Sequence, residues 1–325
     1  MKQLMLNLMW RTGAFAPFRL AHRNRALILT YHRFSADGAS QTVSESQFRW
    51  QLQYLTSRYH VVPLSQLAAG HALPPRAVAI TIDDGYRDAY ELAFPLLKEF
   101  GLPATLFVVT DFLDGRIWLW PDKVRWMFAH TPCNEVVIHS MSPTPRFQLA
   151  DEASRRHAAA DMNERFKALS EPLKEFEISR LARLLKVRLP ARPTAAYAPV
   201  TWDEACEMDR AGIEIGSHTV THPILTRVST EQLRRELQAS RERLERKLQR
   251  EVKQFCYPNG DYDERVHAAV AKAGYECAVT TTRGFNDQRS DRLALRRVHT
   301  AEDQPHFAQS TSGFEQVRLQ LAQRG

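Results

Sequence analysis

Two short segments hold the residue types of a hydrolytic metal site. The first is TIDDGY at residues 81–86, which ends a strongly apolar stretch. Adjacent carboxylates such as Asp83 and Asp84 are costly there unless something neutralises them. Successive side chains of a strand point in opposite directions, so a bend at Gly85 is needed to bring both to one site. Taken alone, the segment also fits a solvated Asp-Asp-Gly turn.

The second segment is SHTVTHP at residues 217–223, directly after the candidate strand 213–216. Its two histidines, His218 and His222, are four residues apart, and imidazole nitrogen suits a divalent metal. Pro223 disfavours helix at His222, so we expect the pair on a turn or one short helical turn. The carboxyl end of a strand is where α/β barrels place their sites.

The two segments together indicate a chemistry. One aspartate with His218 and His222 gives three protein ligands and leaves a position for water, which is the layout of a catalytic metal site. The second aspartate can then take the proton from that water. The predicted reaction is metal-assisted hydrolysis of a carbonyl compound.

Strands and helices that could position these residues alternate along the chain. Helix starts are marked by capping residues, Ser44 with Gln47 and Thr201 with Glu204. The alternation predicts a closed α/β barrel or a wound sheet. The candidate strands are residues 26–31, 77–82, 104–109, 213–216, 252–257, 276–281 and 293–298.

The alternation stops between about residues 110 and 200, and this stretch is too long for a plain loop in a compact domain. A charged helical pattern runs through residues 151–189, so we predict an inserted cap or lid. Its clustered aromatic residues favour a small core of their own, while stacking on sugar rings is the alternative. The cluster consists of Trp118, Trp120, Trp126 and Phe128.

Composition adds a modest excess of positive charge, with 44 Lys and Arg against 37 Asp and Glu, a net charge of +7. Such an excess favours acidic surroundings such as phospholipid headgroups or lipid pyrophosphates. No basic recognition motif accompanies it, so a nucleic-acid partner is not expected. The four cysteines form no CxxC pair and no disulfide framework, which suits a reducing compartment.

Residues 1–25 carry no small-residue cleavage site, so a secretory signal is not expected and the protein is expected in the cytoplasm. Apolar residues and arginines alternate in this segment. They would form either an amphipathic anchor at the inner face of the cell membrane or an ordinary helix packed on the domain. The apolar residues concerned are Leu4, Leu8, Phe15 and Phe18. Residues 301–325 are expected as a C-terminal tail.

TIDDGY, SHTVTHP and the later FCYPNG at residues 255–260 resemble, in this order, the motifs of the polysaccharide deacetylase family. The family is also called the NodB-homology family or carbohydrate esterase family 4. Residues 31–33 resemble its early strand and residues 281–298 its closing segment. The resemblance covers roughly residues 26–112 and 195–300. It implies a distorted (β/α)7-type barrel over residues 26–300, with a helical insertion at 110–200.

The resemblance also implies roles for the motif residues. Asp83 matches the catalytic base, and the metal ligands, usually to zinc, match Asp84, His218 and His222. The implied reaction removes the N-acetyl group of an aminosugar in a polysaccharide or lipid-linked glycan and releases acetate.

Neighbouring groups receive supporting roles from the same resemblance. A backbone N–H near Tyr257 would hold the oxyanion together with the metal. Ser217 and Thr221 would support the two histidines.

This chain departs from the family pattern in three places. The third motif has Cys256 and Tyr257 where many members carry an arginine, and no Trp-Asp-type fourth motif is visible. Strand alternation sends Arg296 and Arg297 to opposite faces, so we hypothesise that Arg297 pairs with Asp83 and that Arg296 is solvated. The third departure is in the final motif, which commonly supplies a histidine acid after Leu-x-x and here reads LRRVH at residues 295–299. The general acid therefore stays open, with His299 as a candidate.

Two other functions fit the same motifs less well. One is a deacylase or amidase of the same fold that acts on a small amide. The other is a non-catalytic sugar-binding barrel, against which the presence of Asp83 beside a complete ligand set argues. The aminosugar, the chain length and the oligomeric state are left open.

Overall fold

A closed barrel of seven parallel strands forms the centre of the computed structural model, which describes residues 2–38, 42–69, 73–301 and 303–322. The strand order is β1-β12-β11-β10-β9-β6-β5, and β5 closes the ring by pairing with β1. The strands are β1 (Leu27–Tyr31), β5 (Ala77–Ile82), β6 (Thr105–Val108), β9 (Glu214–Ser217), β10 (Gln254–Cys256), β11 (Cys277–Arg283) and β12 (Leu295–His299).

All seven candidate strands are confirmed, and the predicted barrel with them. Every residue of β1, β5 and β6 is buried, as expected of parallel strands covered on both faces. The sequence analysis missed β4 (His60–Val61), which pairs with the start of β5. A strand of two residues carries too little alternation to be seen. It also missed the short parallel pair β2 (Phe34–Ser35) and β3 (Val43–Ser44).

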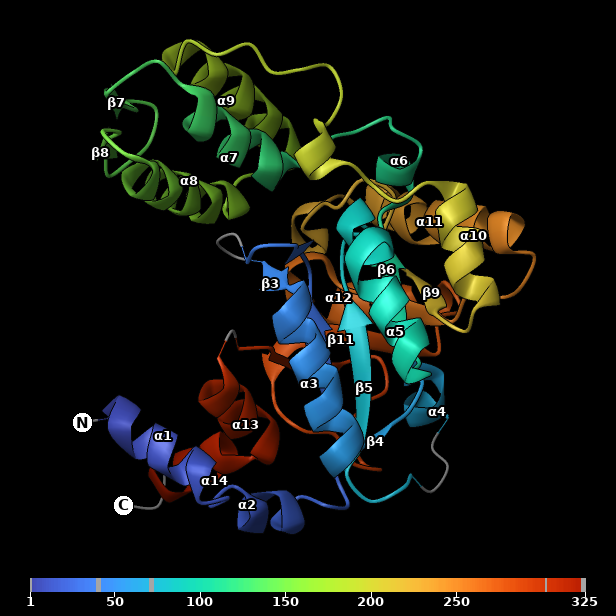
Figure 1. Cartoon of the computed structure of the whole chain (residues 1–325). Coiled ribbons are helices and arrows are strands. Elements are labelled where there is room, and N and C mark those ends of the chain that lie inside the picture. The colour runs from blue at the N-terminus through green and yellow to red at the C-terminus, as the bar shows by residue number, and fades with distance from the viewer. Residues whose placement is uncertain (1, 39–41, 70–72, 302, 323–325) are drawn as a thin grey trace.

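Helices surround the barrel and supply the return connections (Figure 1). The predicted caps are present, since Ser44 and Thr201 each form a capping box. At a third helix start, the Ser229 side chain accepts from the Gln232 N–H. The larger helices are α3 (Glu45–Arg58), α5 (Phe94–Phe100) after the π-helical turn η1 (Ala89–Ala93), α10 (Trp202–Arg210), α11 (Thr230–Leu248) and α12 (Glu264–Lys272). Shorter turns are α4 (Leu64–Ala68), α6 (Thr110–Leu113), η2 (Ala195–Tyr197), η3 (Leu225–Arg227) and η4 (Pro258–Gly260).

The insertion is a small helical unit above the end of the barrel to which β5 points (Figure 1). It consists of α7 (Trp120–His130), the antiparallel pair β7 (Glu135–Val137) and β8 (Arg146–Gln148), α8 (Glu152–Lys167) and α9 (Glu171–Leu184). Its own hydrophobic cluster includes Phe128, Met162 and Phe166, all fully buried. The interpretation of the aromatic residues as a small core is therefore confirmed for Trp120 and Phe128, which belong to this cluster.

The two ends of the chain pack against each other. They form α1 (Lys2–Arg11), α2 (Ala16–Ala21), α13 (Gln304–Ser312) and α14 (Phe314–Ala322). Phe307 of α13 is buried against Trp50 and Tyr54 of α3. The expected C-terminal tail is therefore wrong for the described residues, because apolar side chains of this stretch complete the core beside α3.

The N-terminal apolar residues divide into two groups. Phe15 is buried and Phe18 is half-buried, each against Phe314. Leu4 and Leu8 are 75% and 61% exposed on α1. Within the described residues, no helix combines the length and the apolar character needed to cross a membrane.

Candidate active site

The chain turns sharply where β5 ends. The Asp83 N–H still donates to the Tyr31 carbonyl of the neighbouring strand β1, at 2.9 Å. Asp84 and Gly85 then take positive φ values of 76° and 83°. A Cβ atom on Gly85 would lie 3.0 Å from Val108, so the position requires glycine both for conformation and for space. The predicted bend is confirmed, and Asp84 shares it.

The three predicted ligands converge. Asp84 Oδ1 lies 3.4 Å from His218 Nε2 and 3.5 Å from His222 Nε2, and the three ligand atoms all lie within 4.8 Å of one another. A tetrahedral site with bonds of about 2.1 Å has ligand–ligand distances of about 3.4 Å. The spacing and the donor set, one carboxylate and two imidazoles, therefore fit a divalent metal such as zinc.

The protonation states of Asp84 and His222 also suit metal binding, whereas His218 must release a proton when a metal binds. Burial would lower the pKa of His218, but Cys256 and Asp84 raise it well above its usual range. Burial alone would raise the pKa of Asp84, but the hydrogen bond to His218 and the charge of His222 lower it instead. Burial, and next to it the charge of His218, lowers the pKa of His222 to about 4. His222 is therefore neutral at pH 7, as a metal ligand must be.

Backbone groups orient the histidines. The Nδ1 atom of His218 lies 2.7 Å from the Cys256 carbonyl, which assigns the proton to Nδ1 and leaves Nε2 facing Asp84. His222 has a φ of 59°, and its N–H donates to Thr219 Oγ1 at 3.0 Å. The predicted placement on a turn is thus confirmed.

Ser217 and Thr221 support the two histidines through the loop that carries them, since their hydroxyl groups donate to residues of the following helix. Ser217 Oγ donates to Ser240 at 2.8 Å, and Thr221 Oγ1 donates to Glu236 at 2.6 Å. The same Glu236 carboxylate accepts the N–H groups of Val220 and Thr221. The sequence does not single out Glu236, because its helix is rich in charged residues and such a pattern ordinarily indicates a solvent-exposed face.

Arg297 takes the place of the missing third-motif arginine. It is 1% exposed, and its Nη1 and Nη2 atoms donate to the two carboxylate oxygens of Asp83 at 2.8 and 2.7 Å. Its Nε donates to the Thr280 carbonyl, and Arg296 is exposed. The hypothesised pairing is confirmed. Burial would raise the pKa of Asp83, but Arg297 lowers it to about 2.

A further histidine, His32, lies beside Asp83, the candidate base. His32 Nε2 is 3.7 Å from Asp83 Oδ2, and the His32 side chain is 44% exposed to the cavity side of β1. His299, the candidate from the sequence, is exposed and stacks on His32 with ring centroids 6.3 Å apart. His32 lines the cavity above Asp83 and Asp84, which is described below, and His299 is not among the residues that line it. The strand-end argument applied to β1 would have found His32.

Tyr257 lines the cavity, but its polar groups are engaged elsewhere. Its hydroxyl donates to the Leu293 carbonyl at 2.8 Å. Its N–H donates to Val279 in the sheet, at 3.2 Å, so this amide is not free for an oxyanion. Asn259, two residues on, lines the cavity with a φ of 59°. A catalytic role for Tyr257 stays a prediction.

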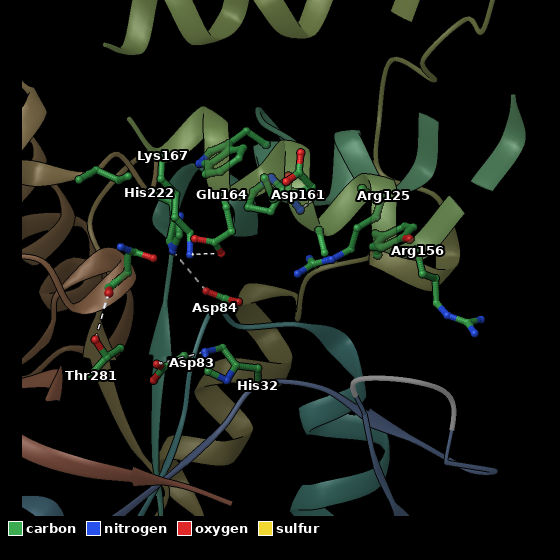
Figure 2. Close-up of a pocket in the computed structure, with 18 of the residues that line it drawn as sticks. His32, Asp83, Asp84, Arg125, Arg156, Asp161, Glu164, Lys167, His222 and Thr281 are labelled. Carbon is green, nitrogen blue, oxygen red and sulfur yellow. Dashed lines mark hydrogen bonds and ion pairs between the residues drawn. The ribbon is translucent and has the colours of Figure 1, made fainter. Parts of the chain in front are cut away.

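The catalytic cavity has a volume of about 650 Å³ and lies between the barrel and the insertion. Figure 2 shows Asp83, Asp84 and His32 on its floor, with Asp161, Glu164 and Lys167 of α8 facing them from the insertion. A carboxylate base held by a guanidinium, next to three metal-ligand atoms, is equipped to activate water against a carbonyl group bound in this cavity.

Comparisons with known proteins agree with this chemistry. The family model described as "Polysaccharide deacetylase" matches residues 70–182 and 185–278. YxkH of Bacillus subtilis (strain 168), a protein named for the same family, is 22% identical over 279 residues, which are 84% of this chain and 71% of YxkH.

A segment of 99 residues is 31% identical to the poly-β-1,6-N-acetyl-D-glucosamine N-deacetylase of Escherichia coli (strain K12). It spans 28% of this chain and 15% of that enzyme. The structure of the deacetylase PplD of Streptococcus pyogenes in complex with acetate superimposes with a TM-score of 0.59 at 19% identity, covering 89% of this chain and 98% of PplD. The structural likeness shows that the two chains share a fold.

Proposed function

This chain belongs to the polysaccharide deacetylase family, and from that premise we propose that it hydrolyses the N-acetyl group of an aminosugar within a glycan, releasing acetate and a free amine. The observation that carries the proposal is the convergence of Asp84, His218 and His222 beside Asp83, which Arg297 holds in place. This arrangement lies at the floor of a cavity large enough for a sugar residue.

Each protein group has a defined task. Asp83 is ionised at neutral pH and accepts a proton from the water that attacks the acetyl carbonyl. Arg297 fixes the orientation of its carboxylate with two hydrogen bonds. A divalent metal, for which we propose zinc, would be held by Asp84, His218 and His222 and, when bound, polarises the carbonyl and lowers the pKa of water.

The amine leaving group needs a proton, and two histidines are near enough to be considered. We propose His32 as the donor, because it lines the cavity and lies 3.7 Å from Asp83. His299 is the second candidate, since it stacks on His32, although it does not line the cavity itself.

The E. coli relative is named for poly-β-1,6-N-acetyl-D-glucosamine, and this supports N-acetylglucosamine in a polysaccharide or lipid-linked glycan as the substrate class. The experiment is acetate release from N-acetylglucosamine oligomers by the wild type and by Asp83→Asn. Turnover should fall about 10²- to 10⁴-fold, the usual worth of a general base, while bound metal stays near the wild-type level. If Asp83→Asn loses bound metal and turnover to the same extent, Asp83 is a metal ligand and not the base. A small-amide deacylase would instead release acetate from simple amides and none from the oligomers.

We also propose contact with the inner face of a membrane, through α1. Leu4, Met5 and Leu8 are all more than half exposed and lie on one side of this helix, while Leu6 on the other side is buried. Residues 1–36 contain no Asp or Glu, and arginine occurs at positions 11, 19, 23 and 25, without an ion pair among the residues that the structure describes; Arg33 is excluded because it pairs with Asp88. An exposed apolar face next to these four arginines suits an anionic lipid surface. Phe15 and Phe18 pack against Phe314 and are not part of the proposed membrane-binding face.

A further inference from the structure

A second pocket, which we call the arginine pocket, lies at the end of the barrel remote from the catalytic cavity. Its volume is about 610 Å³, and its lining includes Arg19 of α2, Arg23 of the turn that follows α2, and Arg76. Arg76 directly precedes β5 and Asp83 follows it. A strand of six residues separates the two by about 20 Å, so the arginine pocket is a separate site.

The backbone brings the two segments of the arginine pocket together. The Arg76 N–H donates to the Arg23 carbonyl at 2.6 Å. Arg19 is half-buried, and its Nη1 atom donates to the hydroxyl group of Tyr54 in α3 at 3.2 Å. The fold therefore sets the three arginines next to one another, although they come from segments about 50 residues apart in the chain.

The positive charge of the arginine pocket has no counter-charge from the protein. No Asp or Glu is among the residues that line it. In the described parts of the chain none of its three arginines forms an ion pair, whereas Arg33 nearby in sequence pairs with Asp88. Guanidinium groups gathered in this way repel one another and attract an anion. Phosphate is the anion whose geometry a guanidinium fits best, together with carboxylate.

Between the arginines the lining of the pocket is apolar. It consists of Ala16, Leu20 and Pro75, and Leu20 is 59% exposed. A free phosphate ion would contact the arginines and leave this apolar area in water. A phospholipid instead places a phosphate group next to the start of an acyl chain, so that both parts of the lining are used. The pocket therefore fits an anionic lipid better than an inorganic anion.

The position of the pocket agrees with the membrane contact proposed for α1. Residues 12–15 connect α1 to α2, and Figure 1 shows both helices at the end of the molecule opposite to the insertion. A lipid surface in contact with Leu4 and Leu8 of α1 would adjoin α2 as well. The exposed apolar face and the arginine pocket are thus close enough to engage one membrane.

We propose that the arginine pocket binds the phosphate group of an anionic phospholipid, with Arg19, Arg23 and Arg76 as donors and Leu20 against the acyl chain. The pocket shares no residue with the catalytic cavity, so lipid binding there does not depend on deacetylation. The proposed membrane contact through α1 thereby gains a defined headgroup site.

The test is a calorimetric titration of the full chain with dihexanoyl phosphatidylglycerol, whose short acyl chains keep it monomeric in water at low concentration. The wild type should bind this lipid more tightly than dihexanoyl phosphatidylcholine and more tightly than inorganic phosphate. The double variant Arg23→Gln, Arg76→Gln should bind it more weakly by about 5-fold for each arginine removed, the usual effect of an arginine beside an anionic lipid. Acetate release from soluble oligomers should stay unchanged in this variant.

The control is Arg183→Gln, Arg210→Gln, which removes the same charge from exposed arginines of α9 and α10 and should keep the wild-type affinity. Leu4→Gln, Leu8→Gln should also bind the soluble lipid normally, since it alters α1 and not the pocket. Equal weakening in the pocket and control variants would show an effect of net charge alone and overturn the proposal. Phosphate binding as tight as lipid binding, or no lipid binding by the wild type, would overturn it as well.

Discussion

Asp83 stays ionised in a buried position because Arg297 donates two hydrogen bonds to its carboxylate. An ordinary aspartate has a pKa near 3.9, and here the pKa is lowered to about 2. A lowered pKa stabilises the folded protein at any pH above about 4, and this stabilisation disappears as the pH falls toward 2. The same pair keeps the base available at neutral pH.

Replacing Arg297 by Met should therefore raise the pKa of Asp83, since burial then acts without an opposing charge. The acidic limb of the pH–rate profile should move to higher pH, and turnover should fall. Arg296→Met is the matched control, because Arg296 is exposed at the neighbouring position of β12. An unchanged acidic limb in Arg297→Met would show that Asp83 works without a cationic partner.

The two candidate histidines can be told apart by the turnover of their alanine variants. Loss of the general acid lowers turnover by about 10²- to 10⁴-fold. We expect this result for His32→Ala, and a much smaller change for His299→Ala. A larger loss of turnover in His299→Ala than in His32→Ala would indicate that His299 is the general acid.

Some positions could be predicted from spacing. Strand alternation was enough to separate Arg297 from Arg296, and the two motifs selected His218, His222 and one aspartate. That this aspartate is Asp84 and not Asp83 came from the resemblance to the family. His32 could have been noted as a histidine at the end of β1, but its contact with Asp83 could not be predicted, since it depends on the pairing of β1 with β5. The anchoring role of Glu236 depends likewise on how α11 packs on the histidine loop.

At the scale of elements, the barrel strands were predictable because a strand buried on both faces has a nearly continuous run of apolar residues. The terminal helices were not, because their apolar residues face one another across nearly the whole chain length. Phe15 and Phe18 contact Phe314, and this pairing has no local signature. The sequence thus left the N-terminal segment open between a membrane surface and the protein, and the structure divides it between exposed and packed residues.

The exposed face of α1 leads to a prediction about membranes. The double variant Leu4→Gln, Leu8→Gln should lose most binding to vesicles that contain phosphatidylglycerol, as measured by co-sedimentation. Binding by the wild type should weaken as salt rises, because arginines near an anionic surface contribute about 1 kcal/mol each and are screened. Leu173→Gln, Phe176→Gln is the control, since these residues are also exposed but lie on α9 of the insertion. Equal binding by both double variants would contradict the proposal.

At the scale of the whole molecule, an insertion of helices turns the open end of a barrel into a cavity with two walls. Its presence was predictable, because the strand–helix alternation stops near residue 110 and resumes near residue 200. Its position over the site was not, because that depends on contacts such as Tyr86 with Asp122. The barrel thus supplies the catalytic groups and the insertion supplies a surface that faces them.

The central claim, metal-dependent deacetylation at Asp83 and Asp84, is tested most directly by measuring acetate release together with bound metal. The wild type should hold one divalent ion per chain, lose activity when a chelator removes it, and regain activity with zinc. His218→Ala and His222→Ala should each lose both the ion and the activity, because two protein ligands bind far more weakly than three. Full acetate release by the metal-free wild type, or full metal occupancy in both histidine variants, would contradict the account.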